Sequence, residues 1–298
     1  MNYECLICQV KALGKRMDKY EVPGEKRNEL VSSMIKEIAE IDLDNSYSPE
    51  ITFNLLEQLK QHSEVFDPYQ TEKDESNREM LEHYYEFKRL VEDSKNPFDT
   101  ALRLAIAGNI IDFGPGHEFD IHETINRVLI SNFTIDHSQQ LQEAIKNAKS
   151  ILYLGDNCGE IVLDKLFLET LNHADVTFAV RNSAVLNDAT LKEATEVGIP
   201  EVASLITNGD GAPSTLLHRV SPEFNAIYNS ADVIISKGMG NYEGLMEEND
   251  PRLFYLLMIK CPTIGKKIGA KTGDFVVKRS VNPLEHHSEL NLVSAFKS

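Results

Sequence analysis

The stretch that decides the fold reads Ser150-Ile-Leu-Tyr-Leu-Gly-Asp-Asn-Cys-Gly-Glu-Ile-Val-Leu-Asp164. Its apolar run from Ile151 to Leu154 predicts a buried strand, which stops at Gly155. After Gly159 the apolar residues recur at helical spacing, so a helix is expected to follow a short polar turn. A strand, a tight turn and a helix form the unit from which parallel sheets are built.

The polar turn of this unit carries Asp156 and Asn157. Ligands of parallel sheets bind just beyond the carboxyl ends of the strands, and a helix N-terminus favours anions. We therefore expect Asp156 to be open to solvent and to face a ligand. The simpler interpretation is that Asp156 or Asn157 only caps the helix, and the later loops bear on this choice.

Strand and helix patterns alternate from residue 149 to the C-terminus. The alternation predicts βα units and a doubly wound, mostly parallel sheet in an α/β/α (Rossmann-like) sandwich over residues 149–298. Helices are expected at 189–197 and 215–221. The expected strands are 151–154, 176–180, 202–207, 233–236, 254–259 and 275–277.

Residues 1–148 are predicted to form a mainly helical domain beside this sandwich. Apolar residues recur at helical spacing, and breaks such as Pro23-Gly24 separate the segments. The segment 101–117 is small and apolar, which is typical of a helix buried on most sides. Asn109 lies near its end, and either packs closely in the core or reaches the edge of a site.

Composition excludes several classes of protein. The chain has 298 residues, of which 42% are hydrophobic, and its net charge is −17. Nucleic-acid and anionic-membrane surfaces need clustered cations, so neither partner is expected. No apolar run approaches the roughly 18 residues of a membrane span, and the N-terminus lacks the apolar core of a secretory signal. These features predict a cytoplasmic protein and leave its oligomeric state open.

The four cysteines are too few for a disulfide framework in a chain of this length. Cys5-Leu-Ile-Cys8 has the spacing of half a zinc ribbon, but no second Cys-x-x-Cys completes it. We favour partly buried, structural thiols on the first helix over metal or redox chemistry.

Oxygen-bearing side chains follow four successive predicted strands. The carboxyl ends of parallel strands lie on one edge of a sheet, so these loops are expected to converge on one site. Aspartate and asparagine oxygens without His or Cys suit divalent ions such as Mg²⁺ or Mn²⁺. A metal together with a lysine suits a phosphoryl group. The loops carry Asp156-Asn157, Asn187-Asp188, Asn208 to Asp210, and Asn241 to Glu243, and the cations are Arg181 and Lys237.

Three familiar catalytic signatures are missing. The Gly-x-x-x-x-Gly-Lys-[Ser/Thr] motif of P-loop NTPases is absent. Lys237-Gly-Met-Gly-Asn241 lacks the third glycine of a dinucleotide-binding loop. The Gly-x-Ser-x-Gly signature of serine hydrolases is absent too.

Five motifs follow one another along the chain: Gly108-Asn-Ile-Ile-Asp112, Gly155-Asp-Asn-x-Gly-Glu160, Leu186-Asn-Asp188, Gly209-Asp-Gly-Ala-Pro213 and Lys237-Gly-x-Gly-Asn-Tyr-Glu243. Together they resemble one known family, the DUF89 metal-dependent phosphatases, also called damage-control or ARMT1-like phosphatases. Cys5-x-x-Cys8 is similar to the prokaryotic and archaeal branch. The resemblance implies a helical region beside an α/β/α sandwich, and hydrolysis of small phosphorylated metabolites with Mn²⁺, Co²⁺, Ni²⁺ or Mg²⁺.

The resemblance also implies roles for single residues. The family's metal ligands fall on Asp156, Asn157 and Asp188, and its phosphate-binding lysine falls on Lys237; these four are the expected catalytic residues. Whether water on the metal or a carboxylate attacks phosphorus stays open. The residues expected near the substrate are Asn109, Glu160, Arg181, Asp210, Gly238, Gly240 and Asn241.

Two alternatives to a phosphatase come from other classes of protein. The first is a protein that binds a phosphorylated metabolite without turning it over. The second is an S-adenosylmethionine-dependent carboxyl methyltransferase, an activity attributed to one eukaryotic branch of the family. No glycine-rich cofactor loop in the sequence supports it.

Overall fold

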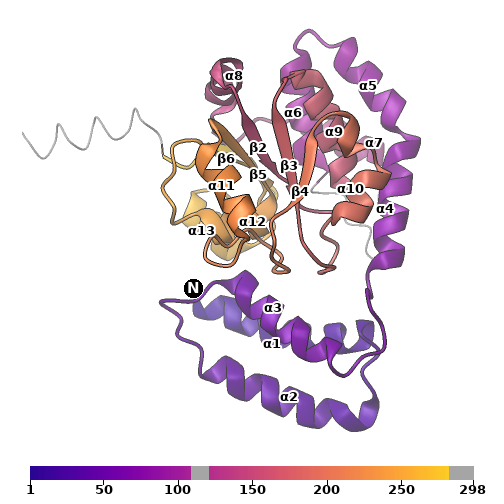
Figure 1. Cartoon of the computed structure of the whole chain (residues 1–298), viewed down its shortest axis with the longest axis vertical. Coiled ribbons are helices and arrows are strands. Elements are labelled where there is room, and N and C mark those ends of the chain that lie inside the picture. The colour runs from indigo at the N-terminus through magenta and orange to yellow at the C-terminus, as the bar shows by residue number, and fades with distance from the viewer. Residues whose placement is uncertain (109–120, 282–298) are drawn as a thin grey trace, which may run out of the picture.

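A single seven-stranded sheet organises the computed structural model, which describes residues 1–108 and 121–281 (Figure 1). Its strand order is β1-β7-β6-β5-β2-β3-β4, and every neighbouring pair is parallel except β6 and β7. The predicted doubly wound, mostly parallel α/β/α fold is confirmed. The strands are β1 (Ile135–Asp136), β2 (Ile151–Leu154), β3 (Val176–Val180), β4 (Ser204–Thr207), β5 (Val233–Lys237), β6 (Leu253–Met258) and β7 (Phe275–Arg279).

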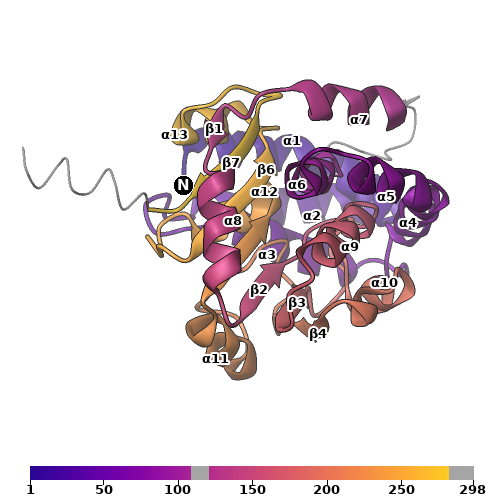
Figure 2. The same ribbon diagram turned by 90° about the horizontal axis from the view of Figure 1, so that it is seen from above.

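Helices cover both faces of the sheet (Figure 2), because successive residues of each buried strand point to opposite sides. In β2, Ile151 and Tyr153 enter one hydrophobic core, whereas Leu152 and Leu154 enter the other. No described helix has both the length and the apolar character that crossing a bilayer demands. The first core is covered by α4 (Gln70–Glu82), α5 (Tyr84–Glu92), α6 (Pro97–Ala107), α7 (Ile121–Ile130), α8 (Ser138–Asn147), α9 (Glu160–Leu171) and α10 (Leu191–Glu196), the second by α11 (Pro222–Ser230), α12 (Gly238–Leu245) and α13 (Pro262–Ile268).

The first three helices form a third core of their own. They are α1 (Tyr3–Lys19), α2 (Gly24–Ala39) and α3 (Ser48–Lys60), and Figure 1 shows them beyond one end of the sheet. Val185, from the loop after β3, packs into this core. The helical unit therefore covers the edge of the sheet where β3 ends.

The hydrophobic cores divide the chain at a different place from the predicted boundary at 148/149. Helices α4 to α7 share a core with the sheet and not with α1 to α3. The reason is visible in α6, whose residues Leu104 to Ala107 are fully buried against neighbours on nearly all sides. Two separately folding domains, 1–148 and 149–298, stay a prediction.

The helix predicted at 215–221 is wrong. That stretch forms turns, and the helix α11 starts at Pro222 instead. The Ser221 hydroxyl accepts a hydrogen bond from the Phe224 backbone N–H at 3.1 Å, which caps the helix. Because proline fits only the first turn of a helix, the Ser221-Pro222 pair marks a start and not an interior.

The order of the strands creates a crevice at one point of the sheet. The chain leaves β2 for β3 and β4 on one side, and later builds β5 and β6 on the other. Beyond the carboxyl ends of β2 and β5 the connecting loops therefore part in opposite directions. Open α/β sheets bind their ligands at such switch points.

Candidate functional site at the carboxyl edge of the sheet

The three predicted metal ligands come together because β2 and β3 are parallel neighbours. The loops that follow the two strands are joined by backbone contacts. The Ala189 N–H donates to the Asp156 carbonyl at 2.8 Å, and Asn157 and Asp188 form an isolated antiparallel bridge. Asp156, Asn157 and Asp188 thus occupy one place at the switch point, although Asp188 lies 31 or more residues further along the chain.

The carboxylates of this group are buried, contrary to the solvent access expected for Asp156. Asp156 is 8% exposed and Asp188 3%. Burial raises the pKa of Asp156 well above its ordinary value, and repulsion from Asp188 and Glu160 adds to this effect. Burial also raises the pKa of Asp188, against the opposing charge of Arg181. A bound cation would favour the ionised form of both carboxylates.

Arg181 lies behind the two aspartates and is itself buried. Its Nε is 2.7 Å from Asp188 Oδ2, and its Nη2 is 3.5 Å from Asp156 Oδ1. We expected this guanidinium to bind substrate. The contacts show that it instead orients the aspartates, so substrate binding by Arg181 stays a prediction that this geometry does not favour.

Gly238, the first residue of α12, packs directly against Asp156. A Cβ at this position would lie 1.9 Å from Asp156 Oδ2, and the backbone has φ +75°. At Gly240 a Cβ would lie 2.4 Å from the carbonyl oxygen of Pro213. Both glycines thus allow close packing around the site.

The ammonium group of Lys237 is held by buried partners beside the site, so its expected contact with phosphate stays a prediction that this geometry does not favour. Its side chain is fully buried, and its Nζ lies 2.6 Å from Glu160 Oε1 and donates to the Ala105 carbonyl at 2.8 Å. It also pairs with Asp164. Despite burial, the two carboxylates hold the pKa of Lys237 above its ordinary value.

Glu160 connects the buried Lys237 to the predicted metal ligands. The backbone N–H of Asn157 donates to Glu160 Oε2 at 3.4 Å, and the Asn157 amide group does so at 3.3 Å. Asp164 accepts a hydrogen bond from the Tyr153 hydroxyl at 2.7 Å, and burial raises the pKa of Asp164 to about 7. Lys237, Glu160 and Asp164 therefore form a layer beneath the site.

Asp210 and Asn241, both predicted near substrate, have other partners. Asp210 accepts two hydrogen bonds from Arg219, at 3.0 and 2.9 Å. Asn241 is fully buried and donates to the carbonyl oxygens of Lys237 at 2.8 Å and Gly155 at 3.1 Å. These side chains join loops to one another. Asn109 lies outside the described residues.

A cavity of about 410 Å³ opens in front of the predicted metal ligands. Helices α1 and α3 form its far wall, since Gln9, Ser48 and Thr52 line it opposite the sheet. The side chains of Asp156, Asn157 and Asp188 line its near wall. The helical unit therefore completes a pocket that the sheet alone would leave open.

The basic residues that line this cavity are Lys260 and Arg16, neither of which was predicted. Lys260 is exposed, follows β6, and lies near enough to Asp156 to oppose the rise in its pKa. Burial lowers the pKa of Arg16, which donates to Gln9 Oε1 at 2.8 Å. The rule that placed the other loops would have found Lys260, because it directly follows the predicted strand 254–259.

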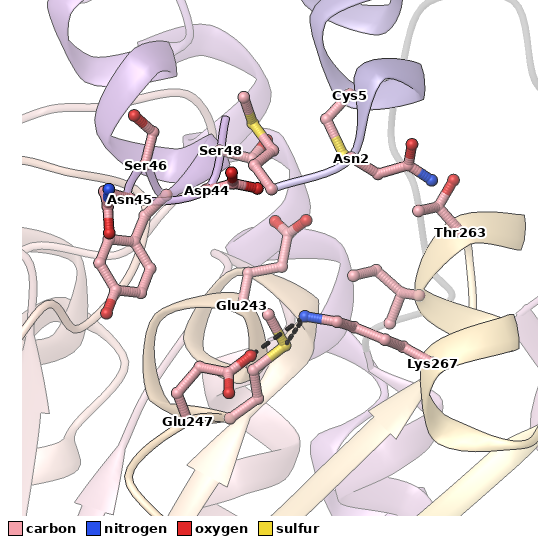
Figure 3. A pocket seen from close by; sticks show the side chains of 14 residues that line it. Asn2, Cys5, Asp44, Asn45, Ser46, Ser48, Glu243, Glu247, Thr263 and Lys267 are labelled. Atoms are coloured by element: carbon pink, nitrogen blue, oxygen red, sulfur yellow. Dashed lines mark hydrogen bonds and ion pairs between the residues drawn. The ribbon is translucent and has the colours of Figure 1, made fainter. Parts of the chain in front are cut away.

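A second cavity, of about 530 Å³, adjoins the first and shares Glu243 with it. Figure 3 shows the Glu243 carboxylate pointing into this space, while Lys267 is 3.2 Å from Glu247. Burial raises the pKa of Glu243 to about 7, and Lys267 partly opposes this rise. Glu243 is thus an acidic group at the junction of the two cavities.

Three of the four cysteines line the first cavity. Cys5 and Cys8 come from the start of α1, and Cys261 follows Lys260. All are free thiols. The expectation of thiols that only support the first helix is therefore incomplete, because Cys5-x-x-Cys8 faces the same space as the metal ligands.

Fold and site together define an α/β/α protein with an oxygen-ligand site at the switch point of its sheet. Comparison with known proteins gives the family: residues 1–276 match the damage-control phosphatase ARMT1-like domain. The chain belongs to this family, as its motifs predicted.

Two of the relatives are archaeal damage-control phosphatases. A damage-control phosphatase from Pyrococcus horikoshii is 31% identical over 94% of this chain and 98% of its own length. Another, from Archaeoglobus fulgidus, is 30% identical over 84% of this chain and 90% of its own. The crystal structure of a DUF89 family protein from P. horikoshii superposes with a TM-score of 0.83, covering 94% of this chain and 99% of that one at 30% identity.

Proposed function

We propose that this protein is a divalent-metal-dependent phosphatase that hydrolyses small phosphorylated metabolites. Membership of a phosphatase family supports the reaction class. The observation that carries the proposal is the convergence of Asp156, Asn157 and Asp188 on one cavity at the switch point. The alternatives, a binding protein without turnover and a methyltransferase, have no comparable support.

The residues present fit a hard divalent ion. Asp156, Asn157 and Asp188 offer carboxylate and amide oxygens, which suit Mg²⁺ or Mn²⁺ and are compatible with Co²⁺ or Ni²⁺. A bound divalent ion would stabilise the ionised form of Asp156 and Asp188, whose pKa values are raised by burial. When bound, the ion would polarise the phosphoryl group as a Lewis acid.

The protein's own side chains have separate roles in this proposal. Glu160 and Arg181 orient the ligands from behind. Lys260, from the front, supplies positive charge to the phosphate oxygens that the metal leaves uncompensated. Hydrolysis breaks the phosphorus–oxygen ester bond, adds water across it and releases inorganic phosphate.

The cavity indicates the size and polarity of the substrate. Its volume of about 410 Å³ is within the range of small-molecule sites. Gln9, Ser48 and Thr52 supply amide and hydroxyl groups to its far wall. A phosphorylated metabolite with several hydroxyl groups, such as a sugar phosphate, fits this lining.

The test is hydrolysis of p-nitrophenyl phosphate and a panel of sugar phosphates, with Mn²⁺, Co²⁺, Ni²⁺ and Mg²⁺ supplied in turn. Asp156→Ala should lower turnover on the order of a hundredfold or more, because a charged ligand is lost. It should also abolish the rise in melting temperature that Mg²⁺ causes in the parent. Asp175 is an exposed aspartate at the amino edge of the sheet, so Asp175→Ala should change neither turnover nor the effect of metal on the melting temperature.

Two outcomes would oppose the proposal. Activity at Asp156→Ala with an unchanged metal requirement would place the site in another loop. Tight binding of sugar phosphates with metal, but no phosphate release over hours, would favour the binding protein.

A further inference from the structure

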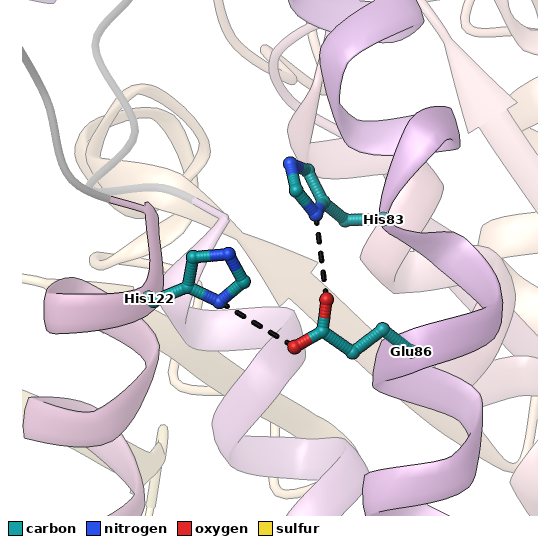
Figure 4. Close-up of side chains that lie close together, drawn as sticks. All are labelled: His83, Glu86 and His122. Atoms are coloured by element: carbon teal, nitrogen blue, oxygen red, sulfur yellow. Dashed lines mark hydrogen bonds and ion pairs between the residues drawn. The ribbon is translucent and has the colours of Figure 1, made fainter.

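Two histidines and a glutamate meet on the face of the sheet that helices α4 to α10 cover, away from its carboxyl edge. His83 lies where α4 ends and α5 begins, Glu86 is in the first turn of α5, and His122 is in the first turn of α7. One ligand atom from each side chain lies within 4.8 Å of the others. Figure 4 shows each imidazole directed at a different oxygen of the Glu86 carboxylate.

The separations in this group suit a shared metal ion better than hydrogen bonds. His83 Nδ1 is 3.5 Å from Glu86 Oε2, and His122 Nδ1 is 3.4 Å from Glu86 Oε1. Ordinary N–H···O bonds span about 2.7–3.2 Å. Two ligand atoms at about 2.0–2.1 Å from one zinc ion and at the tetrahedral angle lie about 3.3–3.4 Å apart, which is the spacing of each imidazole nitrogen from its own carboxylate oxygen. Because the two nitrogens face different oxygens, an ion shared by both would take both oxygens of Glu86.

The rings of His83 and His122 meet edge to face. Their planes are perpendicular, with centroids 5.1 Å apart, and each ring keeps its Nδ1 toward Glu86. The side chains are 30% and 52% exposed, and that of Glu86 is 45% exposed. An ion can therefore reach the three ligands from solvent and keep water as a fourth.

We propose that His83, Glu86 and His122 form a second metal site, which binds Zn²⁺ or a similar transition-metal ion. Two imidazoles and one carboxylate are a common zinc ligand set, whereas Mg²⁺ prefers oxygen ligands. The oxygen ligands of the first site thus favour Mg²⁺ or Mn²⁺, whereas the imidazoles of the second favour Zn²⁺.

The site would reinforce the contact between α5 and α7, which both pack on α6. A bound ion would join Glu86 and His122 directly and hold the start of α7 against α5. The role we propose for it is structural.

The experiment titrates the metal-stripped full chain with Zn²⁺ in competition with a chelating dye. His122→Ala and His83→Ala should each weaken one zinc equivalent by about a hundredfold or more, since loss of a mere outer-shell partner already costs 10–100-fold. Zinc should raise the melting temperature of the parent more than that of either variant. The same difference should persist in an Asp156→Ala background, which separates this site from the catalytic one.

The matched control is His218→Ala. His218 Nε2 lies 3.5 Å from Glu50, but among the described residues no second imidazole joins these two side chains as a third ligand. His218→Ala should therefore not change zinc binding. Equal zinc stoichiometry and affinity in the parent and His122→Ala would overturn the proposal. If His122→Ala fails to fold, Glu86→Gln decides by the same measurement, because it removes the charged ligand from a half-exposed position.

Discussion

At the scale of single residues, two lysines near the site have opposite environments. Lys237 is fully buried between Glu160 and Asp164, whereas Lys260 is exposed and lines the cavity. The family motif points to Lys237 as the phosphate ligand, but the contacts favour Lys260. A motif identifies an important lysine and does not reveal which way its ammonium group points.

The two lysines should therefore respond differently to alanine. Lys237→Ala should lower the free energy of unfolding by about 3–5 kcal/mol, because it leaves two buried carboxylates uncompensated. Lys260→Ala should leave stability within about 0.5 kcal/mol and lower kcat/KM by about 10–100-fold through lost contact with phosphate. Urea unfolding and steady-state kinetics measure both quantities.

Lys266→Ala is the control, since Lys266 is exposed on α13 and does not line the cavity. If Lys237→Ala instead lost phosphate binding at unchanged stability, the contact predicted from the motif would be correct.

At the scale of secondary-structure elements, the start of α12 determines where Asp156 lies. The element begins at Gly238, in a left-handed conformation, where a side chain would meet the Asp156 carboxylate. The helix that follows β5 therefore begins directly behind Asp156, in the loop after the neighbouring strand β2. The site depends on this close approach between the two elements.

Gly238→Ala tests the close approach. The positive φ should cost about 1 kcal/mol or more of stability, and the new Cβ should displace Asp156 and lower activity by at least about tenfold. Gly273→Ala has the same backbone cost at φ +91°, but nothing lies within 4 Å of its Cβ. Thermal unfolding should respond to both variants, and phosphatase activity and metal affinity only to Gly238→Ala. Equal activity in the two variants would contradict the proposed packing role.

At the scale of the whole molecule, α1 to α3 turn an open edge of the sheet into enclosed space. Both cavities have walls from this helical unit as well as from the sheet loops, and Glu243 lies between them. Its burial arises from that assembly, and it raises the pKa of Glu243 from 4.5 to about 7. The fold therefore favours the neutral carboxyl group.

This pKa shift predicts how stability depends on pH. Because the folded-state pKa is raised, the contribution of the neutral carboxyl is complete below about pH 4.5 and is lost as pH rises through about 7. Glu243→Gln keeps a neutral side chain, so its stability relative to the parent should rise between pH 5 and 8, by about 1–3 kcal/mol. Melting temperatures across this range measure the effect. Glu248→Gln, at an exposed position, should show no such change with pH. A stability difference between Glu243→Gln and the parent that does not vary with pH would show that the Glu243 carboxyl is solvated.

The sequence by itself determined six of the seven strands, their mostly parallel direction and the convergence of their loops, but not the short strand β1. Apolar runs broken by glycine, as at Ile151 to Gly155, encode these features locally, and parallel strands necessarily end on one edge. The Ser221-Pro222 helix start was equally local and could have been predicted. Family membership followed from the same loop motifs.

Only the tertiary structure decided which side chains face the cavity. The direction of Lys237 depends on Asp164 and on Ala105 from α6, neither of which its own loop reveals. The far wall depends on α1 and α3, whose wall-lining residues are more than 100 positions along the chain from Asp156. Strand and helix periodicity report burial along one element, whereas the partner of a buried charge is a property of the assembled molecule.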